Sequence, residues 1–161
     1  MEKKTGIVGF TGAFRDNLKG IADGSKIVFT GSAAVCTPFI ELLSYAIRDK
    51  NHDLIFVPNA DLKQTKMLKM ENNLGYSAVD IKADPSNPDV VVVMGGLAMP
   101  KFGCSPDDVL NMVKEISNGH NPKIIGVCFM SIFKKSGWIN SIPFDVIIDT
   151  KMETTIYQDL P

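Results

Sequence analysis

The sequence predicts an α/β fold, a single-domain Rossmann-like three-layer sandwich around a mostly parallel sheet of about five to seven strands. Short continuous apolar runs alternate with amphipathic stretches, which is the pattern of parallel strands joined by helices. The chain has 161 residues and contains no linker, internal repeat or low-complexity tract that would divide it. We therefore expect one domain over residues 1–161, with a helical N-terminal segment, 1–25, packed on it.

The first strand and the first two helices have distinct signals. Residues 26–30 form an apolar run of the kind that is buried on both faces of a sheet. In residues 38–50 apolar side chains recur at helical spacing, with Thr37 as a suitable N-cap and Pro38 at the first helical position. Within the N-terminal segment, residues 13–22 are expected to form a helix that covers one face of the domain.

The middle of the chain is expected to add two strands and one helix. Residues 54–57 are a second apolar run, which ends at Pro58. A weaker helix is predicted over 61–73, ending at Gly75. Lys63, Lys66 and Lys69 would share one side of that helix, either as a solvated face or as a surface for anions.

A third strand is expected at 77–81 and a fourth at 90–94. The connection between them contains Pro85 and Pro88 and is too short for a full crossover helix. It is therefore either an extended coil or a link between antiparallel strands. We favour the coil, because the apolar run 90–93 is typical of a central strand that is buried on both faces.

The last third of the chain begins with an uncharged loop and a well-marked helix. Ser105 is a suitable cap, Pro106 opens the helix, and Asp107 and Asp108 suit the positive end of its dipole. The remaining expected elements are a strand at 123–129, a short helix near 131–135, a strand at 144–149 and a candidate seventh strand at 154–157, joined through a hairpin at 150–152.

Composition excludes several functional classes. Lys and Arg number 17 against 18 Asp and Glu, whereas a general nucleic-acid binder usually carries a basic surplus. No uncharged apolar run approaches the ~18 residues that span a bilayer. The N-terminal stretch lacks the continuous apolar centre of a signal peptide. Three cysteines, an odd number, do not form a disulfide framework. We expect a cytoplasmic protein with reduced thiols that binds neither nucleic acid nor membranes.

A ligand site is expected where the strand order reverses, beyond the carboxyl ends of the first and fourth strands. Hydroxyl groups and free backbone N–H groups at two helix starts would favour an anion there. The leading hypothesis is a domain that binds a small anionic or nucleotide-like molecule, with the cofactor, and whether any reaction occurs, left open. The residues expected at this site are Gly31, Ser32, Cys36, Thr37, Asp61, Gly95, Gly96, Cys104 and Ser105.

Several of these residues have two interpretations. Neither the dinucleotide fingerprint nor the P-loop motif is present after the first strand. Gly95 and Gly96 would allow a ligand to approach the backbone closely, or they would serve a tight turn. Asp61 would recognise a ribose or cap the helix that it begins.

The three cysteines support an alternative hypothesis. Cys36, Cys104 and Cys128 all map to the carboxyl edge of the sheet, and a helix N-terminus stabilises a nearby thiolate. Together they would serve a thiol-dependent redox protein or hold a metal or iron–sulfur cluster. Otherwise they are small apolar residues that pack under loops. His52 and His120 precede strands and therefore lie at the opposite edge, which argues against a Cys–His mechanism.

A second alternative is a subunit whose function is association. The eight methionines could contribute an adaptable apolar surface, and a homo-oligomer is compatible with the composition.

Five short stretches, found at residues 27–32, 36–39, 41–43, 56–59 and 92–96, resemble an uncharacterised domain-of-unknown-function family from methanogenic archaea. The resemblance covers residues 24–149 and implies a Rossmann-like fold and a cytoplasmic archaeal setting. The family carries no established activity, so the resemblance assigns no catalytic residue. The layout of the first strand, Asp61 and the coil before the fourth strand is also similar to that of adenosylmethionine-dependent methyltransferases. The glycine pattern that those enzymes place after the first strand is absent.

Overall fold

The computed structural model describes residues 1–158 and 161, which form a seven-stranded sheet of order β4-β3-β2-β1-β5-β6-β7. Five strands run parallel, and β3 runs antiparallel to both of its neighbours. The strands are β1 (Lys26–Gly31), β2 (Asp53–Pro58), β3 (Lys66–Glu71), β4 (Gly75–Val79), β5 (Val90–Met94), β6 (Lys123–Phe129) and β7 (Val146–Thr150). The predicted α/β sandwich with a mostly parallel sheet is confirmed.

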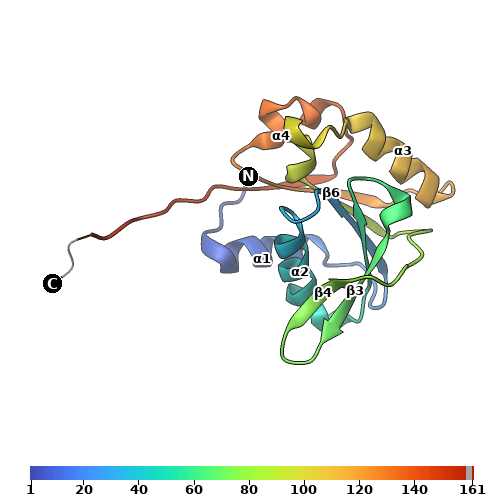
Figure 1. The fold of residues 1–161 in the computed structure, drawn as a ribbon, viewed down its shortest axis with the longest axis horizontal. Coiled ribbons are helices and arrows are strands. Elements are labelled where there is room, and N and C mark those ends of the chain that lie inside the picture. The colour runs from blue at the N-terminus through green and yellow to red at the C-terminus, as the bar shows by residue number, and fades with distance from the viewer. Residues whose placement is uncertain (159–160) are drawn as a thin grey trace.

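Helices cover both faces of the sheet, which makes the three layers (Figure 1). Alternate residues of β1 point to opposite faces: Phe29 joins the core cluster beneath α1 and α2, and Val28 joins the cluster beneath α3. The helices are α1 (Gly6–Asn17), α2 (Thr37–Ala46), α3 (Pro106–Ser117) and α4 (Ile132–Lys135), with 3₁₀ turns η1 (Arg48–Lys50), η2 (Leu62–Gln64), η3 (Gly95–Ala98), η4 (Pro100–Phe102) and η5 (Trp138–Asn140). Within the described residues, no helix combines the length and apolar content needed to cross a bilayer.

The strand order reverses between β1 and β5, as predicted. From β1 the chain moves outward through β2, and it then returns across the sheet to place β5 on the other side of β1. The return is the extended coil that the sequence favoured. Lys26 holds this coil at the amino end of β1, because its Nζ donates hydrogen bonds to the carbonyl oxygens of Asp84 and Ser86, both at 2.8 Å.

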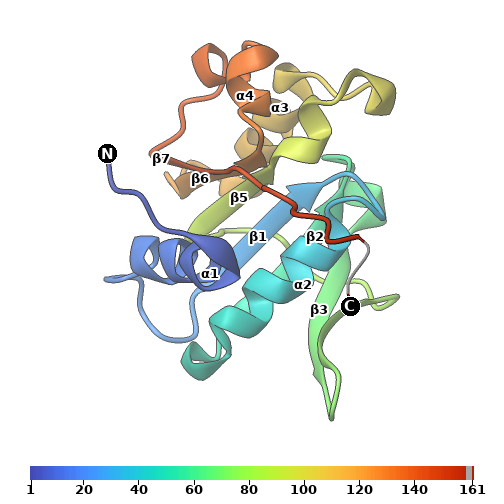
Figure 2. The ribbon, with the colours of Figure 1, turned by 90° about the vertical axis from the view of Figure 1, so that its left-hand side faces the viewer.

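The predicted helix over 61–73 is wrong. Only η2 is helical, and the following residues form the β3–β4 hairpin (Figure 2). In β3 Leu68 is buried while Lys69 and Met70 are exposed. The strand is stabilised by its antiparallel pairing with β2, a contact that is distant in sequence and overrides the helical spacing of the lysines.

Other boundaries also differ from the prediction: the strands expected at 77–81 and 144–149 lie at 75–79 and 146–150, and the helix expected over 38–50 ends at Ala46. The N-terminal helix begins at Gly6 and ends at Asn17, earlier than the expected 13–22. Thr37 is the first residue of α2 rather than its cap, and Cys36 takes the cap position. Residues 154–157 form no strand with their own chain, and the C-terminal segment extends away from the body (Figure 1).

Candidate functional site

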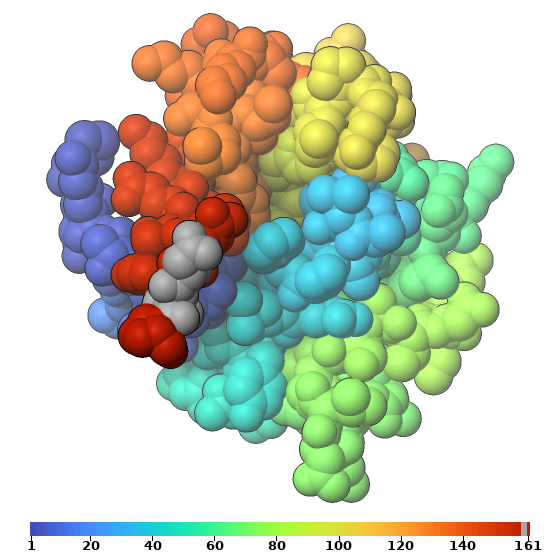
Figure 3. Space-filling view, turned by 60° about the vertical axis from the view of Figure 1, so that its left-hand side comes forward, coloured from blue at the N-terminus to red at the C-terminus, as the bar shows by residue number. Residues whose placement is uncertain are grey.

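At the point where the strand order reverses, the protein's own side chains fill the crevice. The loop after β1 meets the segment after β5 (Figure 3). Ser32 and Cys36 are buried, and their Oγ and Sγ atoms are 3.3 Å apart. A Cβ on Gly96 would lie 2.4 Å from Cys36 Sγ and 2.6 Å from Ser32 Oγ. The predicted residues Gly31, Ser32, Cys36 and Gly96 are therefore brought together, and they pack against one another.

Gly95 makes an equally close contact on the other side. A Cβ there would lie 2.5 Å from Cys128 Cβ and 2.7 Å from Ile132 Cγ2. Gly95 and Gly96 thus sit between Cys128 and Cys36. The contacts that require glycine at these two positions are contacts with the protein itself.

Asp61 and Ser105, two of the residues predicted to contact a ligand, cap η2 and α3. The Asp61 carboxylate accepts hydrogen bonds from Gln64 Nε2 at 2.8 Å and from the Lys63 backbone N–H at 3.0 Å, and these bonds lower its pKa. Ser105 forms a capping box with Asp108 at the start of α3. Its Oγ accepts from the Asp108 N–H at 3.2 Å and donates to the Asp108 carboxylate at 2.8 Å. Thr37 is partly exposed in the first turn of α2.

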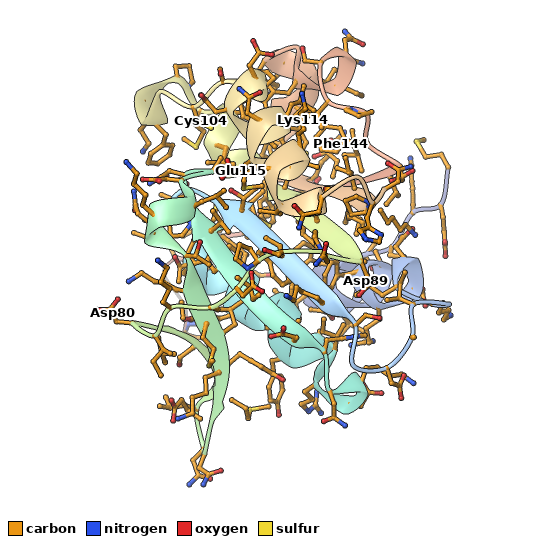
Figure 4. All side chains as sticks on the ribbon, turned by 90° about the vertical axis from the view of Figure 1, so that its right-hand side faces the viewer. Asp80, Asp89, Cys104, Lys114, Glu115 and Phe144 are labelled. Atoms are coloured by element: carbon orange, nitrogen blue, oxygen red, sulfur yellow. The ribbon has the colours of Figure 1, made fainter. Side chains whose placement is uncertain are left out.

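The three cysteines do not converge, so the predicted three-cysteine metal or iron–sulfur site is wrong. Cys36 packs in the cluster beneath α1 and α2, whereas Cys128 is a core member of the opposite cluster. Cys104, labelled in Figure 4, packs against the same cluster as Cys128. Within the described part of the chain, no three His, Cys, Asp or Glu side chains lie close enough to hold a metal ion.

At Cys104 two effects oppose the predicted effect of the helix dipole. Burial, followed by the charge of Asp108, raises the pKa of its thiol to about 11. Burial raises the pKa of Cys128 to about 12, and the hydrogen bond that its thiol donates to Asp149 acts in the same direction. Both groups are therefore neutral thiols at physiological pH.

We expect Cys104 and Cys128 to react slowly with iodoacetamide at pH 8, because alkylation requires the thiolate. Free cysteine should react faster under the same conditions. Since both folded pKa values lie above the unfolded value of 9.0, the associated stability is complete below pH 9 and is lost as the pH rises toward 11–12. Peptide mass spectrometry of timed reactions measures the first effect, and urea unfolding at pH 8 and pH 10 measures the second. Modification of both sites at the rate of free cysteine would contradict the pKa assignments.

A hydrogen-bonded cluster that the sequence analysis missed connects β7 with the turn after β6. The Asp149 carboxylate accepts from Ser131 Oγ at 2.7 Å and from the Ser131 backbone N–H at 3.0 Å. This arrangement places a serine beside a carboxylate. The hydrogen bonds between Asp149 and Ser131 close the turn after β6.

His52 and His120 precede β2 and β6 and therefore lie at the amino ends of the strands, as expected.

Strained backbone concentrates at the carboxyl edge of the sheet. Apart from glycine and asparagine, which tolerate positive φ, four described residues adopt it: Ala34, Ala60, Met130 and Ser131, with φ between 54° and 66°. They lie in the turns after β1, β2 and β6. Strain of this kind costs about 1–3 kcal/mol per residue and clusters at functional sites. It therefore marks this edge as a candidate site.

The same edge carries a lysine-lined pocket of about 390 Å³ beyond the ends of β2 and β4. Asp80, labelled in Figure 4, lies on its rim and accepts a hydrogen bond from Lys66 at 3.4 Å. Among the described residues, Lys63 and Lys82 form no ion pair. The lining residues are Lys63, Gln64, Thr65, Lys66, Asp80 and Lys82. The spacing of the lysines hinted at an anion surface, but the helix assigned to them would not have formed this pocket.

The turn after β2 connects the pocket with the crevice. Thr30 Oγ1 donates to the Val57 carbonyl at 2.8 Å and accepts from the Ala60 N–H at 3.1 Å. The Asn59 N–H donates to the Gly31 carbonyl at 2.9 Å. The end of β1 therefore holds in place the turn that leads into the pocket wall.

Comparison with known proteins identifies relatives in methanogens. The family model "Uncharacterized protein conserved in archaea (DUF2124)" matches residues 5–153. An uncharacterized protein of Methanocaldococcus jannaschii is 42% identical over 132 residues, which cover 82% of this chain and 78% of the relative. An uncharacterized protein of Methanothermobacter thermautotrophicus is 35% identical over 148 residues, 92% of this chain and 91% of the relative.

The fold also matches a solved structure. The crystal structure of a protein of unknown function from Methanothermobacter thermautotrophicus superposes with a TM-score of 0.85 at 32% identity, covering 98% of this chain and 96% of that chain. The sequence match and the shared fold agree with the resemblance seen in the sequence. The chain belongs to the DUF2124 family of proteins conserved in archaea.

Proposed function

We propose that this protein is a small-molecule-binding domain that takes an anionic, phosphate-bearing ligand at the carboxyl edge of its sheet. The observation that carries the proposal is the pocket beyond β2 and β4, whose lining contains three lysines and one aspartate. Its volume lies within the usual range for small-ligand sites. Lysine ammonium groups are common phosphate binders, although they recognise the charge rather than a fixed geometry.

The proposal places the ligand beside the crevice rather than in it. Ser32, Cys36 and Gly96 occupy the space between β1 and β5, so a phosphate approaching there would have to displace the protein's own side chains. The strained turn at Asn59 and Ala60 supports a site one strand away, because it connects the end of β2 with the pocket wall. The ligand would bind through Lys63 and Lys82, which are free of carboxylate partners among the described residues.

Thermal unfolding with inorganic pyrophosphate, ATP and adenosylmethionine tests the proposal. A ligand at ten times its Kd stabilises the folded state by about 1.4 kcal/mol. In a chain of this size that corresponds to a rise in Tm of roughly 3–6 °C. We expect pyrophosphate or ATP to raise Tm in this way, and the effect to shrink as salt concentration rises.

The double variant Lys63→Gln/Lys82→Gln should lose the rise in Tm. Lys114→Gln is the matched control for one lost charge, because Lys114 is exposed on α3, outside the pocket. It should keep the rise. The proposal fails if millimolar pyrophosphate and ATP leave the Tm of the unmodified protein unchanged, or if the double variant responds as strongly as the control.

A further inference from the structure

The C-terminal segment, defined as residues 151–158, is suited to form a strand but pairs with no strand among the residues that the structure describes. All eight residues are exposed and extended, and the segment projects from the body (Figure 1). Thr154, Thr155, Ile156 and Tyr157 are all residues that favour strands. Ile156 and Tyr157 are each 76% exposed. The segment directly continues β7, which is the last strand of the sheet.

The two edges of the sheet are not equivalent. At the β4 edge the Glu41 carboxylate, on α2, accepts a hydrogen bond from the Ala78 N–H at 2.9 Å and so covers the strand. No described residue makes such a bond to the outer edge of β7. Thr150 accepts from the Met130 N–H on the β6 side. Because successive residues alternate, the backbone groups of Ile147 and Asp149 face outward, and those of Lys151, Glu153, Thr155 and Tyr157 would do so if the strand continued.

We infer that two copies of this chain associate through β7 and the C-terminal segment, which pair antiparallel across a two-fold axis and join two sheets into one. An uncovered edge strand is a template for such pairing. A second copy is the occupant that the sequence favours, because the strand is complementary to itself.

Charge and strand length together favour one register. A two-fold axis perpendicular to the sheet places each residue opposite one of the same parity, so the central pair consists of identical residues. With Met152 at the centre, Lys151 lies opposite the partner's Glu153, and both ion pairs form. With residue 151 or 153 at the centre, lysine would face lysine or glutamate would face glutamate, which destabilises a sheet. Centring the pair on Thr150 would also set Lys151 opposite the partner's Asp149, but Ile156 and Tyr157 would then lie beyond the start of β7.

The same register pairs apolar residues. Ile148 lies opposite the partner's Ile156, and Ile147 opposite the partner's Tyr157. Ile148 packs in the cluster beneath α1, so the partner's Ile156 would lie on the α1 side of the joined sheet. Ile7 and Val8, at the start of α1, are 59% and 75% exposed and provide further apolar surface on that side.

Charge reversal tests the register. Sedimentation velocity of the full chain should show a concentration-dependent dimer. Glu153→Lys alone, or Lys151→Glu alone, should raise the dimer dissociation constant about tenfold, because each replaces two attractive pairs with two repulsive ones. The double variant K151E/E153K should restore the original affinity. A monomer at every concentration, or a dimer that the single reversals leave unchanged, overturns the inference.

Proline substitutions test the backbone pairing independently of charge. Thr155→Pro removes an outward N–H that would donate to the partner, whereas Thr154→Pro removes one that points away. We expect T155P to shift the equilibrium toward monomer and T154P to retain the dimer. Equal effects of the two prolines would overturn the proposed pairing. Far-UV circular dichroism confirms that each variant keeps its fold, which is expected because the C-terminal segment lies outside both core clusters.

Discussion

Gly95→Ala is expected to reduce the free energy of unfolding by about 3 kcal/mol, because the added methyl group would overlap atoms that cannot move away. The nearest atom, Cys128 Cβ at 2.5 Å, is attached directly to the backbone of β6, and Cys128 Cα lies at 3.0 Å. In a chain of this size the loss corresponds to a fall in Tm of roughly 6–12 °C. Urea unfolding followed by tryptophan fluorescence measures it.

Gly96→Ala is the matched comparison, because its obstructing atoms are the ends of side chains. Cys36→Ala and Ser32→Ala remove the Sγ and Oγ atoms that lie at 2.4 and 2.6 Å. We expect Gly96→Ala to lower the free energy of unfolding less in the C36A/S32A background than in the unmodified protein. Cys128→Ala keeps its Cβ and should not rescue Gly95→Ala. Rescue of both substitutions, or of neither, would contradict the packing described for the crevice.

Phe14→Ala is expected to cost about 3–5 kcal/mol, because it opens a cavity in a fully buried part of the core. Phe14 lies on α1, has 0% exposure, and its ring centroid is 5.9 Å from that of Phe29 in the central strand. The side chain therefore fixes the N-terminal helix to the middle of the sheet. Urea unfolding at equal protein concentration measures the loss.

Val8→Ala is the control on the same helix. Val8 is largely exposed, so at a protein concentration where the chain is monomeric its truncation should change the free energy of unfolding by no more than about 0.5 kcal/mol. If Phe14→Ala proved as mild as Val8→Ala, α1 would contribute little to the stability of the domain. The burial of Phe14 within the core cluster would then need another explanation.

The sequence alone determined those elements whose signals are local. Residues 90–94 and 123–129 were predicted with the bounds that the structure has, because strands buried on both faces are continuous apolar runs. The capping box at Ser105 is equally local, since the residues that satisfy the first turn of α3 lie within four positions of one another. The position of β1 next to β5 was expected from the strand order of a Rossmann-like fold, and the structure has it.

The hairpin of β3 and β4 could not be predicted in this way. Lys63, Lys66 and Lys69 match the spacing of a helix, and the competing strand depends on pairing with β2. That pairing is a contact between distant residues, and no local pattern reports it. The error also concealed the lysine pocket, which exists only because the hairpin brings Lys82 back beside Lys63.

For the candidate site, the sequence alone determined that the residues lie at the carboxyl edge of the sheet, and the tertiary structure decided what each residue contacts there. Strand direction alone places Cys36, Cys104 and Cys128 at the carboxyl edge. Which face of the sheet each thiol joins depends on side-chain alternation and on where α2 and α3 pack, and these place Cys36 opposite the other two. Whether Gly96 contacts a ligand or another side chain of the protein depends on a few ångströms of packing, and in the structure the side chain of Cys36 packs against it.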